Sequence, residues 1–370
     1  MNIMSKLFGY NDIGIDLGSA NMRVWVKGKG LVMEEPAAVT LVVPHDVGEK
    51  VPEDGHHGEQ DSEPHGKPRK HRILAIGAEA GAMLGKTPGS LIVIRPMKGG
   101  VVCDYDITKN MLRYCLAHEK VKEACKGRFR RPRTVIAVPF GITEVEKRAL
   151  EDAAHSAGAG KVFLVESSMA AAIGAGLHVS EPMGCMIVDI GALATNMAVI
   201  SLAGIVHSNV LRIGGDEVNN AIVAYLRKKY NLLAGEREAE DVKIKIGTAC
   251  TPEKELDYEI RGIDATEGRK LVVKIDSKEI REEALAGLLG QIEETLMEFI
   301  AHIEPELAAD LVDKGIVLTG GGALLRGLDK RLAETTGLPV RVADNPAHAT
   351  IEGVGVVLGE LDFLAKAKKR

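Results

Sequence analysis

Residues 13–24 read IGIDLGSANMRV, and residues 186–199 read MIVDIGALATNMAV. Each stretch is an apolar strand that ends in Asp, followed by an apolar residue, a Gly, a short turn, the pair Asn-Met and a second strand; aligned in this way, the second turn is two residues longer. A supersecondary unit that recurs within one chain indicates a duplicated architecture. We therefore expect two related lobes with a cleft between them.

The two hairpins have the chemistry of a phosphate site. Backbone N–H groups hold polyphosphate well, and glycine allows the chain to approach a ligand closely. Asp16 and Asp189 each end a predicted strand and are placed to hold a hydrated Mg²⁺ that bridges phosphate oxygens. One Asp-x-Gly turn is a common feature after a strand, but two in matching context favour a nucleotide.

A glycine triplet adds to this interpretation. Residues 319–324 read TGGGAL and follow a third predicted strand. Three glycines between a strand and a helix leave room for a flat base or a sugar to pass the backbone. A plain flexible connector is the alternative interpretation.

Composition bounds the class of protein. A chain of 370 residues exceeds the length at which one hydrophobic core stops growing, so two or more domains are expected. The net charge of −5 argues against a nucleic-acid binder. The five cysteines form no CxxC pair, which fits a reducing cytosol. No apolar run approaches the length of a membrane span, and the start of the chain does not fit a secretory signal, so we expect a cytoplasmic protein.

Strand and helix patterns alternate along the chain. Thr143 and Glu146 form a capping box at the start of a helix that stops at Gly158, so Glu146 is interpreted as a cap rather than a catalytic acid. This mixture predicts an α/β fold. We expect strands at 13–16, 22–26, 38–43, 134–138, 185–189, 197–202, 205–210 and 316–318, and helices at 107–124, 143–158, from 216 and over 285–303, closed by Pro305.

Three segments stand apart from this pattern. Residues 45–72 are polar and hold five of the eleven histidines without a metal-ligand spacing, which predicts a mobile insertion loop. Residues 126–133 are basic with Phe129 inside, typical either of a loop that touches acidic lipid or of a solvated turn. On a helix at the start of the chain, apolar residues fall on one side, which suits a membrane anchor or a terminus docked on its own domain. These residues include Ile3, Met4, Leu7 and Phe8.

Several further motifs carry a specific resemblance. They are residues 14–21 (GIDLGSAN), 94–97 (IRPM), 138–143 (VPFGIT), 169–174 (MAAAIG), 212–216 (RIGGD), 235–243 with Gly235, Glu236, Ala239, Glu240 and Lys243, and 318–326 (LTGGGALLR). Together they resemble the actin-like ATPase superfamily and, within it, the MreB-type bacterial actins. The likeness covers nearly the whole chain apart from the insertion.

The resemblance implies a fold, a ligand and partners. The fold would be the actin-like one, a duplicated ribonuclease-H-like α/β architecture with four subdomains around a nucleotide cleft. Lobe I would comprise residues 1–165 and 346–370, and lobe II residues 166–345 with a small subdomain at about 216–280. Such proteins bind ATP with Mg²⁺ and polymerise on the inner face of the cytoplasmic membrane. The partners would be further copies of the same chain, a sister MreB and membrane shape proteins. No nucleic-acid partner is expected.

The resemblance also assigns site residues. Glu240 and Lys243 would touch the adenosine, Gly321 to Leu324 would line the base and phosphate pocket, and the amphipathic start and Phe129 would meet the membrane. The nucleotide-binding set is then Asp16, Gly18, Ser19, Ala20, Asn21, Asp189, Gly191, Ala192, Leu193, Ala194, Thr195, Glu240, Lys243, Gly320, Gly321, Gly322, Ala323 and Leu324.

Two departures from the family pattern concern the γ-phosphate side. Where relatives have three glycines, two threonines and a glutamate, residues 191–196 read GALATN. Added Cβ atoms would cost on the order of 1 kcal/mol per position wherever φ is positive, and Leu193 would place an apolar group near phosphate oxygens. Ser167 stands where the resemblance implies the glutamate that positions the attacking water, and Glu166 beside it would substitute poorly. We therefore expect nucleotide binding to be retained or weakened, and hydrolysis to be slow or absent.

Three other functions compete with a shape-determining filament. A degenerate paralogue would regulate or copolymerise with an active sister. A small-molecule kinase shares the duplicated hairpins but needs a substrate pocket with a catalytic Asp, and no segment matches one. A DnaK-type chaperone needs a separate peptide-binding domain, for which a chain ending at Arg370 is expected to be too short.

Overall fold

The protein is described here by a computed structural model that covers residues 12–43, 72–98, 101–102, 105–125 and 131–367. The amphipathic start, Phe129 and all of the predicted insertion loop except Arg72 lie outside these residues. In the described part of the chain, no helix has the length and apolar character needed to cross a bilayer.

The first half of the chain builds a five-stranded sheet in the order β10-β9-β1-β2-β3. Strands β1, β2 and β3 form an antiparallel meander, and β9 and β10 continue it in parallel with β1. Helices α3, α4 and α5 pack on one face, with Met111, Leu112 and Leu150 in the core. The bounds are β1 (Ile13–Leu17), β2 (Asn21–Val26), β3 (Gly30–Pro36), β9 (Thr134–Val138), β10 (Val162–Glu166), α3 (Tyr105–Ala117), α4 (Glu119–Ala124) and α5 (Glu144–Ala157).

The second half repeats this sheet in the order β13-β12-β11-β17-β18. Its first three strands again form an antiparallel meander, and β17 and β18 run parallel to β11. This identity of order and direction confirms the duplication predicted from the two Asp-x-Gly stretches. The bounds are β11 (Cys185–Ile190), β12 (Thr195–Ser201), β13 (Gly204–Leu211), β17 (Ile316–Thr319), β18 (Val340–Val342), α10 (Ala286–Ala301), α11 (Pro305–Lys314) and α12 (Leu328–Thr336).

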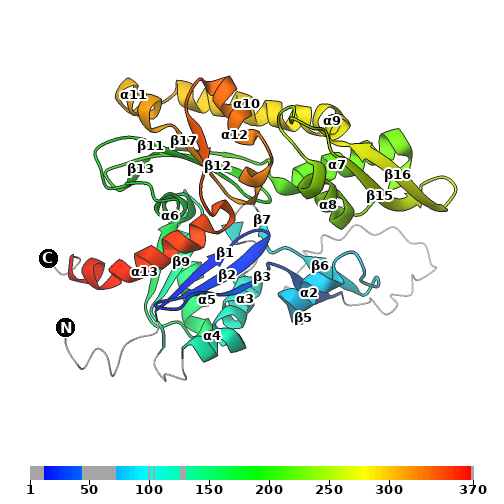
Figure 1. Ribbon diagram of the computed structural model, residues 1–370. Helices are drawn as coiled ribbons and strands as arrows, with labels where there is room; N and C mark the ends of the chain where they lie inside the picture. Colours follow the sequence, from blue (N-terminus) through cyan, green and yellow to red (C-terminus); the bar gives the residue numbers. More distant parts are fainter. Residues whose placement is uncertain (1–11, 44–71, 99–100, 103–104, 126–130, 368–370) are drawn as a thin grey trace, which may run out of the picture.

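A smaller unit is inserted in each half (Figure 1). The unit of the first half is the sheet β5-β4-β6 with α2, and that of the second half is the sheet β14-β15-β16 with α7, α8 and α9. Their bounds are β4 (Val39–Val42), β5 (Arg72–Ile76), β6 (Leu91–Ile94), α2 (Ala78–Met83), β14 (Leu232–Leu233), β15 (Asp257–Asp264), β16 (Lys270–Asp276), α7 (Gly215–Tyr230), α8 (Glu236–Ile246) and α9 (Ser277–Glu279). A two-stranded ribbon of β7 (Met97–Lys98) and β8 (Val101–Val102) follows β6.

The register of the two hairpins corrects one sequence interpretation. Asp16 pairs with Arg23 and Asp189 pairs with Asn196, a separation of seven positions in each hairpin. The second turn is therefore not longer, and the Asn-Met pair at 196–197 takes the positions of Arg23 and Val24 rather than those of residues 21–22. A shift of two residues keeps every side chain on the same face, so alternation alone does not detect it.

Several element boundaries also differ from the predicted ones. The helix expected over 107–124 is interrupted at His118. The helix expected over 285–303 follows a π-helical turn, η1 (Ile280–Leu285), and Pro305 begins a further helix as well as closing this one. The strands that were not predicted are β3, β5, β6, β7, β8, β10, β14, β15, β16 and β18. The capping box is confirmed, since Glu146 N–H donates to Thr143 Oγ1 at 3.2 Å and Thr143 N–H donates to Glu146 Oε2 at 2.7 Å.

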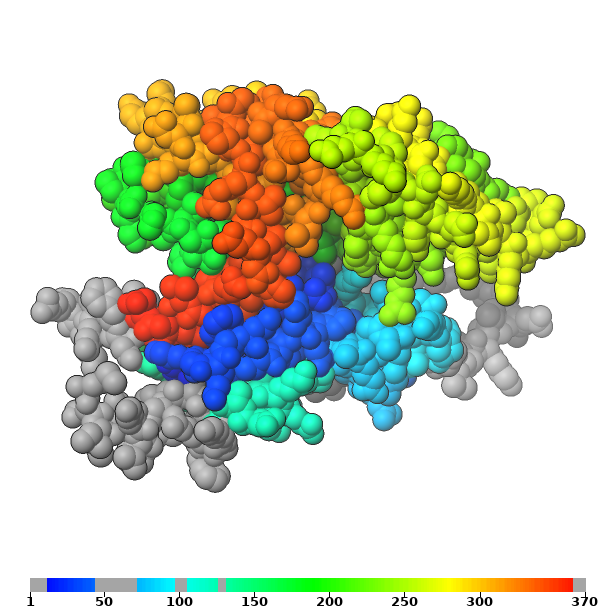
Figure 2. Space-filling model, viewed as in Figure 1, coloured from blue at the N-terminus to red at the C-terminus, as the bar shows by residue number. Residues whose placement is uncertain are grey.

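Two helices join the halves. Helix α6 (Ser167–Gly174) contributes Ala170 to a core with β9 and Ala172 to a core with β11. Helix α13 (Ala349–Ala367) runs beside α6 and packs on β1, β2 and β9. In Figure 1 it lies along the junction of the two sheets, and in Figure 2 the C-terminal residues pass from the upper mass to the lower one.

The contact between α6 and α13 depends on two glycines. A Cβ at Gly353 would lie 1.7 Å from the carbonyl oxygen of Ala170, and a Cβ at Gly174 would lie 1.9 Å from that of Ala349. Real Cβ atoms do not come so near to backbone, so any side chain here forces the helices apart.

We predict that Gly353→Ala lowers the free energy of unfolding by about 1–3 kcal/mol, because the added methyl overpacks the helix contact. The matched control is Gly359→Ala in the same helix, where a Cβ meets nothing within 4 Å. This control should gain about 0.5–1 kcal/mol from helix propensity. Chemical denaturation of both variants checks the pair; equal effects would contradict the packing argument.

Candidate functional site

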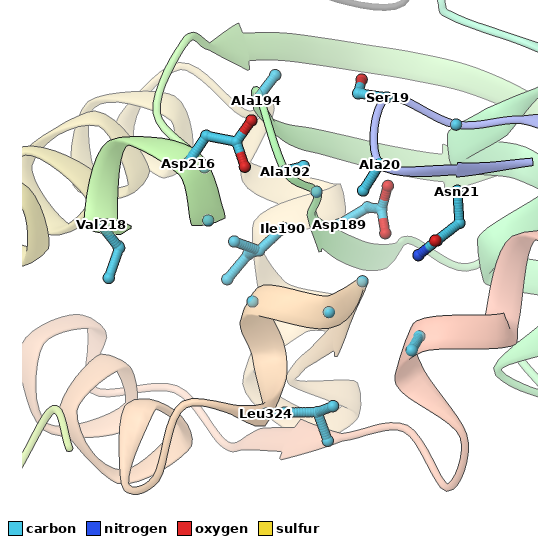
Figure 3. Close-up of a pocket in the computed structure, with 18 of the residues that line it drawn as sticks. Ser19, Ala20, Asn21, Asp189, Ile190, Ala192, Ala194, Asp216, Val218 and Leu324 are labelled. Carbon is cyan, nitrogen blue, oxygen red and sulfur yellow. The ribbon is translucent and has the colours of Figure 1, made fainter. Parts of the chain in front are cut away.

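A cavity of about 710 Å³ lies between the two halves. Its lining comes from the turns of both hairpins, from the N-terminal part of α7, from α8 along its length, and from the glycine turn η2 (Gly321–Leu324) after β17. Figure 3 shows Ser19 and Ala20 of the first hairpin facing the same space as Asp189, with Asp216 of α7 on the other side. The duplicated strands therefore bring the two Asp-x-Gly turns to one cavity.

Most of the predicted site residues line this cavity. They are Asp16, Gly18, Ser19, Ala20, Asn21, Ser167, Asp189, Gly191, Ala192, Ala194, Glu240, Lys243, Gly320, Gly321, Gly322 and Leu324. Glu166, Leu193, Thr195 and Ala323 are not among the lining residues. The Thr195 hydroxyl is fully buried and donates to the carbonyl of Ile213 at 2.8 Å, so it fixes β12 to the segment after β13.

The second turn is free of the backbone strain that we considered. Among the described residues, the only non-glycine residues with positive φ are Leu202, Ala203 and Asn231. The φ-dependent cost therefore does not arise at Ala192 or Leu193. Because Leu193 does not line the cavity, its side chain is also not set against the space expected for phosphate oxygens. The Ala-Leu pair is compatible with this turn.

The carboxylates of Asp16 and Asp189 are held in different ways. Asp16 Oδ2 lies 3.5 Å from Arg23 Nη1. Asp189 accepts a hydrogen bond from Thr319 Oγ1 at 3.0 Å and another from the Asn196 side chain. Burial raises the pKa of Asp16 to about 6, and the charge of Asp189 adds to this rise while Arg23 opposes it. Burial also raises the pKa of Asp189. The two acids thus line one cavity, and the charge of Asp189 acts on the pKa of Asp16.

Asp16 and Asp189 are the carboxylates of the two hairpins that could hold a metal ion in this cavity. Among the residues that the structure describes, no group of three or more His, Cys, Asp or Glu side chains is arranged to hold a metal. Two converging carboxylates with few further protein ligands fit Mg²⁺, which keeps several of its waters and takes phosphate oxygens as well.

An arginine ties the two small units together across the cavity. Arg95 follows β6 in the first half, and its guanidinium forms ion pairs with Asp216 at the start of α7 and with Glu236 at the start of α8, the second at 2.7 Å. Burial lowers the pKa of Arg95, but the two carboxylates more than offset this and the net direction is upward. Sequence reasoning missed this contact because its partners are 121 and 141 residues away.

Lys243 and Glu240 lie one turn apart on α8 and both line the cavity. Lys243 Nζ donates to the carbonyl of Gly215 at 3.1 Å, and it lies 3.9 Å from Glu240 Oε1. Burial lowers the pKa of Lys243, while Glu240 opposes the shift.

Ser167 occupies the position at which the resemblance implies a glutamate. Ser167 begins α6, lines the cavity, and donates its hydroxyl to the carbonyl of Val138 at 2.9 Å. Glu166 ends β10 and does not line the cavity; burial raises its pKa and Lys147 opposes the rise. The geometry therefore does not favour Glu166 as a substitute base.

The sheets, their connection and the cavity define a class, the actin-like proteins. The solved structure of MreB 5 of Spiroplasma citri bound to AMPPNP has a TM-score of 0.84 at 29% identity, covering 97% of this chain and 99% of that chain. A MamK double helical filament has a TM-score of 0.69 at 22% identity, covering 95% and 99%, and shows the fold alone.

Sequence comparison narrows the class to a family. The family model described as MreB/Mbl protein matches residues 63–366. The cell shape-determining protein MreB of Escherichia coli is 43% identical over 355 residues, covering 95% of this chain and 94% of its own length. The cell shape-determining protein Mbl of Bacillus subtilis is 41% identical over 357 residues, covering 96% and 98%. The chain belongs to the MreB/Mbl family.

The raised pKa of Asp16 predicts a pH-dependent stability. Because the folded pKa lies near 6 and the ordinary value is 3.8, the folded state holds the proton more tightly, and the free energy of unfolding falls as the pH rises from about 4 to 6. Asp16→Asn removes this cost, so we expect its free energy of unfolding to exceed that of the wild type by ~3 kcal/mol at neutral pH and by little at pH ~4. Denaturation across this range measures the gap.

The control for this experiment is Asp344→Asn, which changes an exposed carboxylate outside the cavity. It should follow the wild type at every pH. A gap between Asp16→Asn and the wild type that does not change with pH would show that the Asp16 carboxyl is not the titrating group.

Proposed function

We propose that this protein is an ATP-binding actin-like cytoskeletal protein whose filaments determine cell shape. The observation that carries the proposal is the cavity to which both hairpins of the duplicated fold contribute, with Asp16 and Asp189 converging on it. Structures of Spiroplasma citri MreB 5 bound to AMPPNP and to ADP support a nucleotide as the ligand. The MreB and Mbl relatives, which are cell shape-determining proteins, support the cellular role.

The lining suggests how ATP is oriented. The hairpin turns at 18–21 and 191–194 face the phosphates, with Mg²⁺ held through water by Asp16 and Asp189. Glu240 and Lys243 face the adenosine. Leu324 is 62% exposed and, with Ile244, offers apolar surface for the base.

Membership of the family supports a proposal for assembly and location. We propose self-assembly into filaments on the inner face of the cytoplasmic membrane, with a sister MreB and membrane shape proteins as partners. The amphipathic start (Ile3, Met4, Leu7 and Phe8) and Phe129 would make the membrane contact. Lobe I would comprise residues 1–165 and 346–370, and lobe II residues 166–345, with about 216–280 as its small subdomain.

Hydrolysis is proposed to be slow. Phosphoryl transfer depends on a group that positions the attacking water, and Ser167 has no carboxylate and already donates its hydroxyl to Val138. This observation also favours the second candidate, a nucleotide-binding pseudo-actin that copolymerises with an active sister. No observation favours a small-molecule kinase.

Blocking the cavity should abolish assembly. Gly321 lines the cavity, and a Cβ there meets nothing within 4 Å, so Gly321→Val places its side chain in the ligand space without a clash in the fold. We expect wild-type protein to bind ATP and to sediment with ATP and liposomes. We expect Gly321→Val to lose at least about tenfold in affinity, because the valine occupies the ligand space, and to stay in the supernatant.

Gly287→Val is the matched control, since a Cβ at this exposed glycine of α10 also meets nothing within 4 Å. It should bind ATP and sediment like the wild type. Failure of the wild-type protein to sediment under every condition would refute the filament proposal.

Restoring the family pattern should restore turnover. In the triple variant Ser167→Glu, Ala192→Gly, Leu193→Gly, we expect phosphate release to rise at least about tenfold, because a carboxylate is returned to the water-positioning place. Ala192→Gly with Leu193→Gly alone is the control and should remain slow. If the unaltered protein already releases phosphate as fast as the triple variant, the proposal of slow hydrolysis is wrong.

A further inference from the structure

We propose that Arg23 is a built-in counter-charge of the phosphate subsite, which makes nucleotide binding only weakly dependent on a divalent cation. The inference rests on the proposed nucleotide-binding function and goes beyond it, because it assigns part of the role of the metal to a side chain of the protein.

Arg23 belongs to a row of charges that crosses three strands. Asp16 of β1 pairs with Arg23 of β2, and Arg23 pairs with Glu34 of β3. Residues paired in this way point to the same face of a sheet. Arg23 Nη1 lies 3.5 Å from Asp16 Oδ2, and Arg23 Nε lies 2.8 Å from Glu34 Oε1. The Arg23 side chain is 12% exposed and lines the cavity.

Further contacts fix the orientation of this arginine. Glu34 Oε2 lies 2.9 Å from His348 Nε2, and His348 Nδ1 lies 2.9 Å from Asn345 Oδ1. Asn345 Nδ2 donates to Glu352 Oε1 at 2.6 Å. Glu34 thus holds the Nε of the Arg23 guanidinium, and the Nη1 of the same guanidinium faces Asp16. A guanidinium has five N–H donors, and the contacts above engage only Nε and Nη1, so donors remain for a ligand.

The duplicated half supplies an internal comparison. There the corresponding row is Asp189, Asn196 and Val210, and it carries no cation. Within its own half, Asp189 accepts hydrogen bonds from the neutral side chains of Thr319 and Asn196, and the one cation that acts on its pKa is Arg23 of the first half, which lowers it. The hairpin therefore does not need a cation opposite its Asp in order to fold. The arginine in the first half is a feature of the site.

The chemistry of the ligand explains what the arginine adds. A polyphosphate carries several negative charges, which a metal ion normally offsets. Arginine binds phosphate oxygens through a planar fork of donors and stays charged at all relevant pH values. Arg23 is positioned to contact phosphate, and by pairing with Asp16 it also weakens the attraction of that carboxylate for a metal. Both effects shift charge compensation from Mg²⁺ to the protein.

The test compares the dissociation constant of a fluorescent ATP analogue in excess Mg²⁺ and in EDTA. For the wild type, we expect the affinity in EDTA to be less than about tenfold lower than in Mg²⁺. For Arg23→Gln, we expect this drop to be at least about tenfold larger, because one charged hydrogen bond to the ligand is lost. Arg23→Lys keeps the charge but not the planar fork, so its loss of affinity in EDTA should lie between those of the wild type and Arg23→Gln. Arg331→Gln removes an arginine of equal charge that pairs with Glu293 outside the cavity, and it should also behave like the wild type.

A second measurement uses Mn²⁺ alone, followed by its paramagnetic resonance signal. Arg23→Gln should bind Mn²⁺ more tightly than the wild type, because Asp16 then lacks its cation. The inference is overturned if wild-type protein binds nucleotide only with Mg²⁺, or if Arg23→Gln matches it in both buffers. Should Arg23→Gln fail to fold, the wild-type ratio between the two buffers decides the question. Absence of nucleotide binding by the wild type in both buffers would refute the proposed function itself.

Discussion

The close approach of α6 and α13 fixes how the two main sheets meet. These two helices touch at Gly353 and Gly174, where even a methyl group would overlap backbone. Because α6 packs on strands of both sheets and α13 on the first, their separation sets the distance between the two hairpins. The charge of Asp189 raises the pKa of the buried Asp16 carboxyl, and this effect depends on that distance. A charge interaction at the cavity thus depends on a steric fit at the junction of the lobes.

Much of this architecture could be predicted from sequence because its signals are local. The Asp-x-Gly turns, the Thr143 capping box and the apolar strands each depend on residues within a few positions, and the duplication made one hairpin evidence for the other. The match to solved MreB structures and the shared strand order confirm the predicted actin-like fold. Most residues of both predicted turns line one cavity, as the duplication suggested.

The remainder could not be predicted because it depends on register or on distant partners. The Asn-Met match suggested a longer second turn, and a two-residue offset leaves no trace in an alternating pattern. The pairing of Arg23 with Asp16 also depends on register, so it could not be predicted even though both residues lie in the first hairpin. Backbone angles at Ala192 and Leu193 depend on how the turn meets α7, where the carbonyl of Ala192 accepts from the N–H of Asp216.

The bridge made by Arg95 has a consequence for how a ligand enters. Its two ion pairs link the outer units to each other across the cavity. Contacts of this partly exposed kind weaken as salt concentration rises. Ionic strength would then change the rate at which the lobes separate and the ligand exchanges. The affinity of the hairpin turns for the ligand is a separate quantity. The ease with which the cavity opens would thus depend on the salt concentration around the protein.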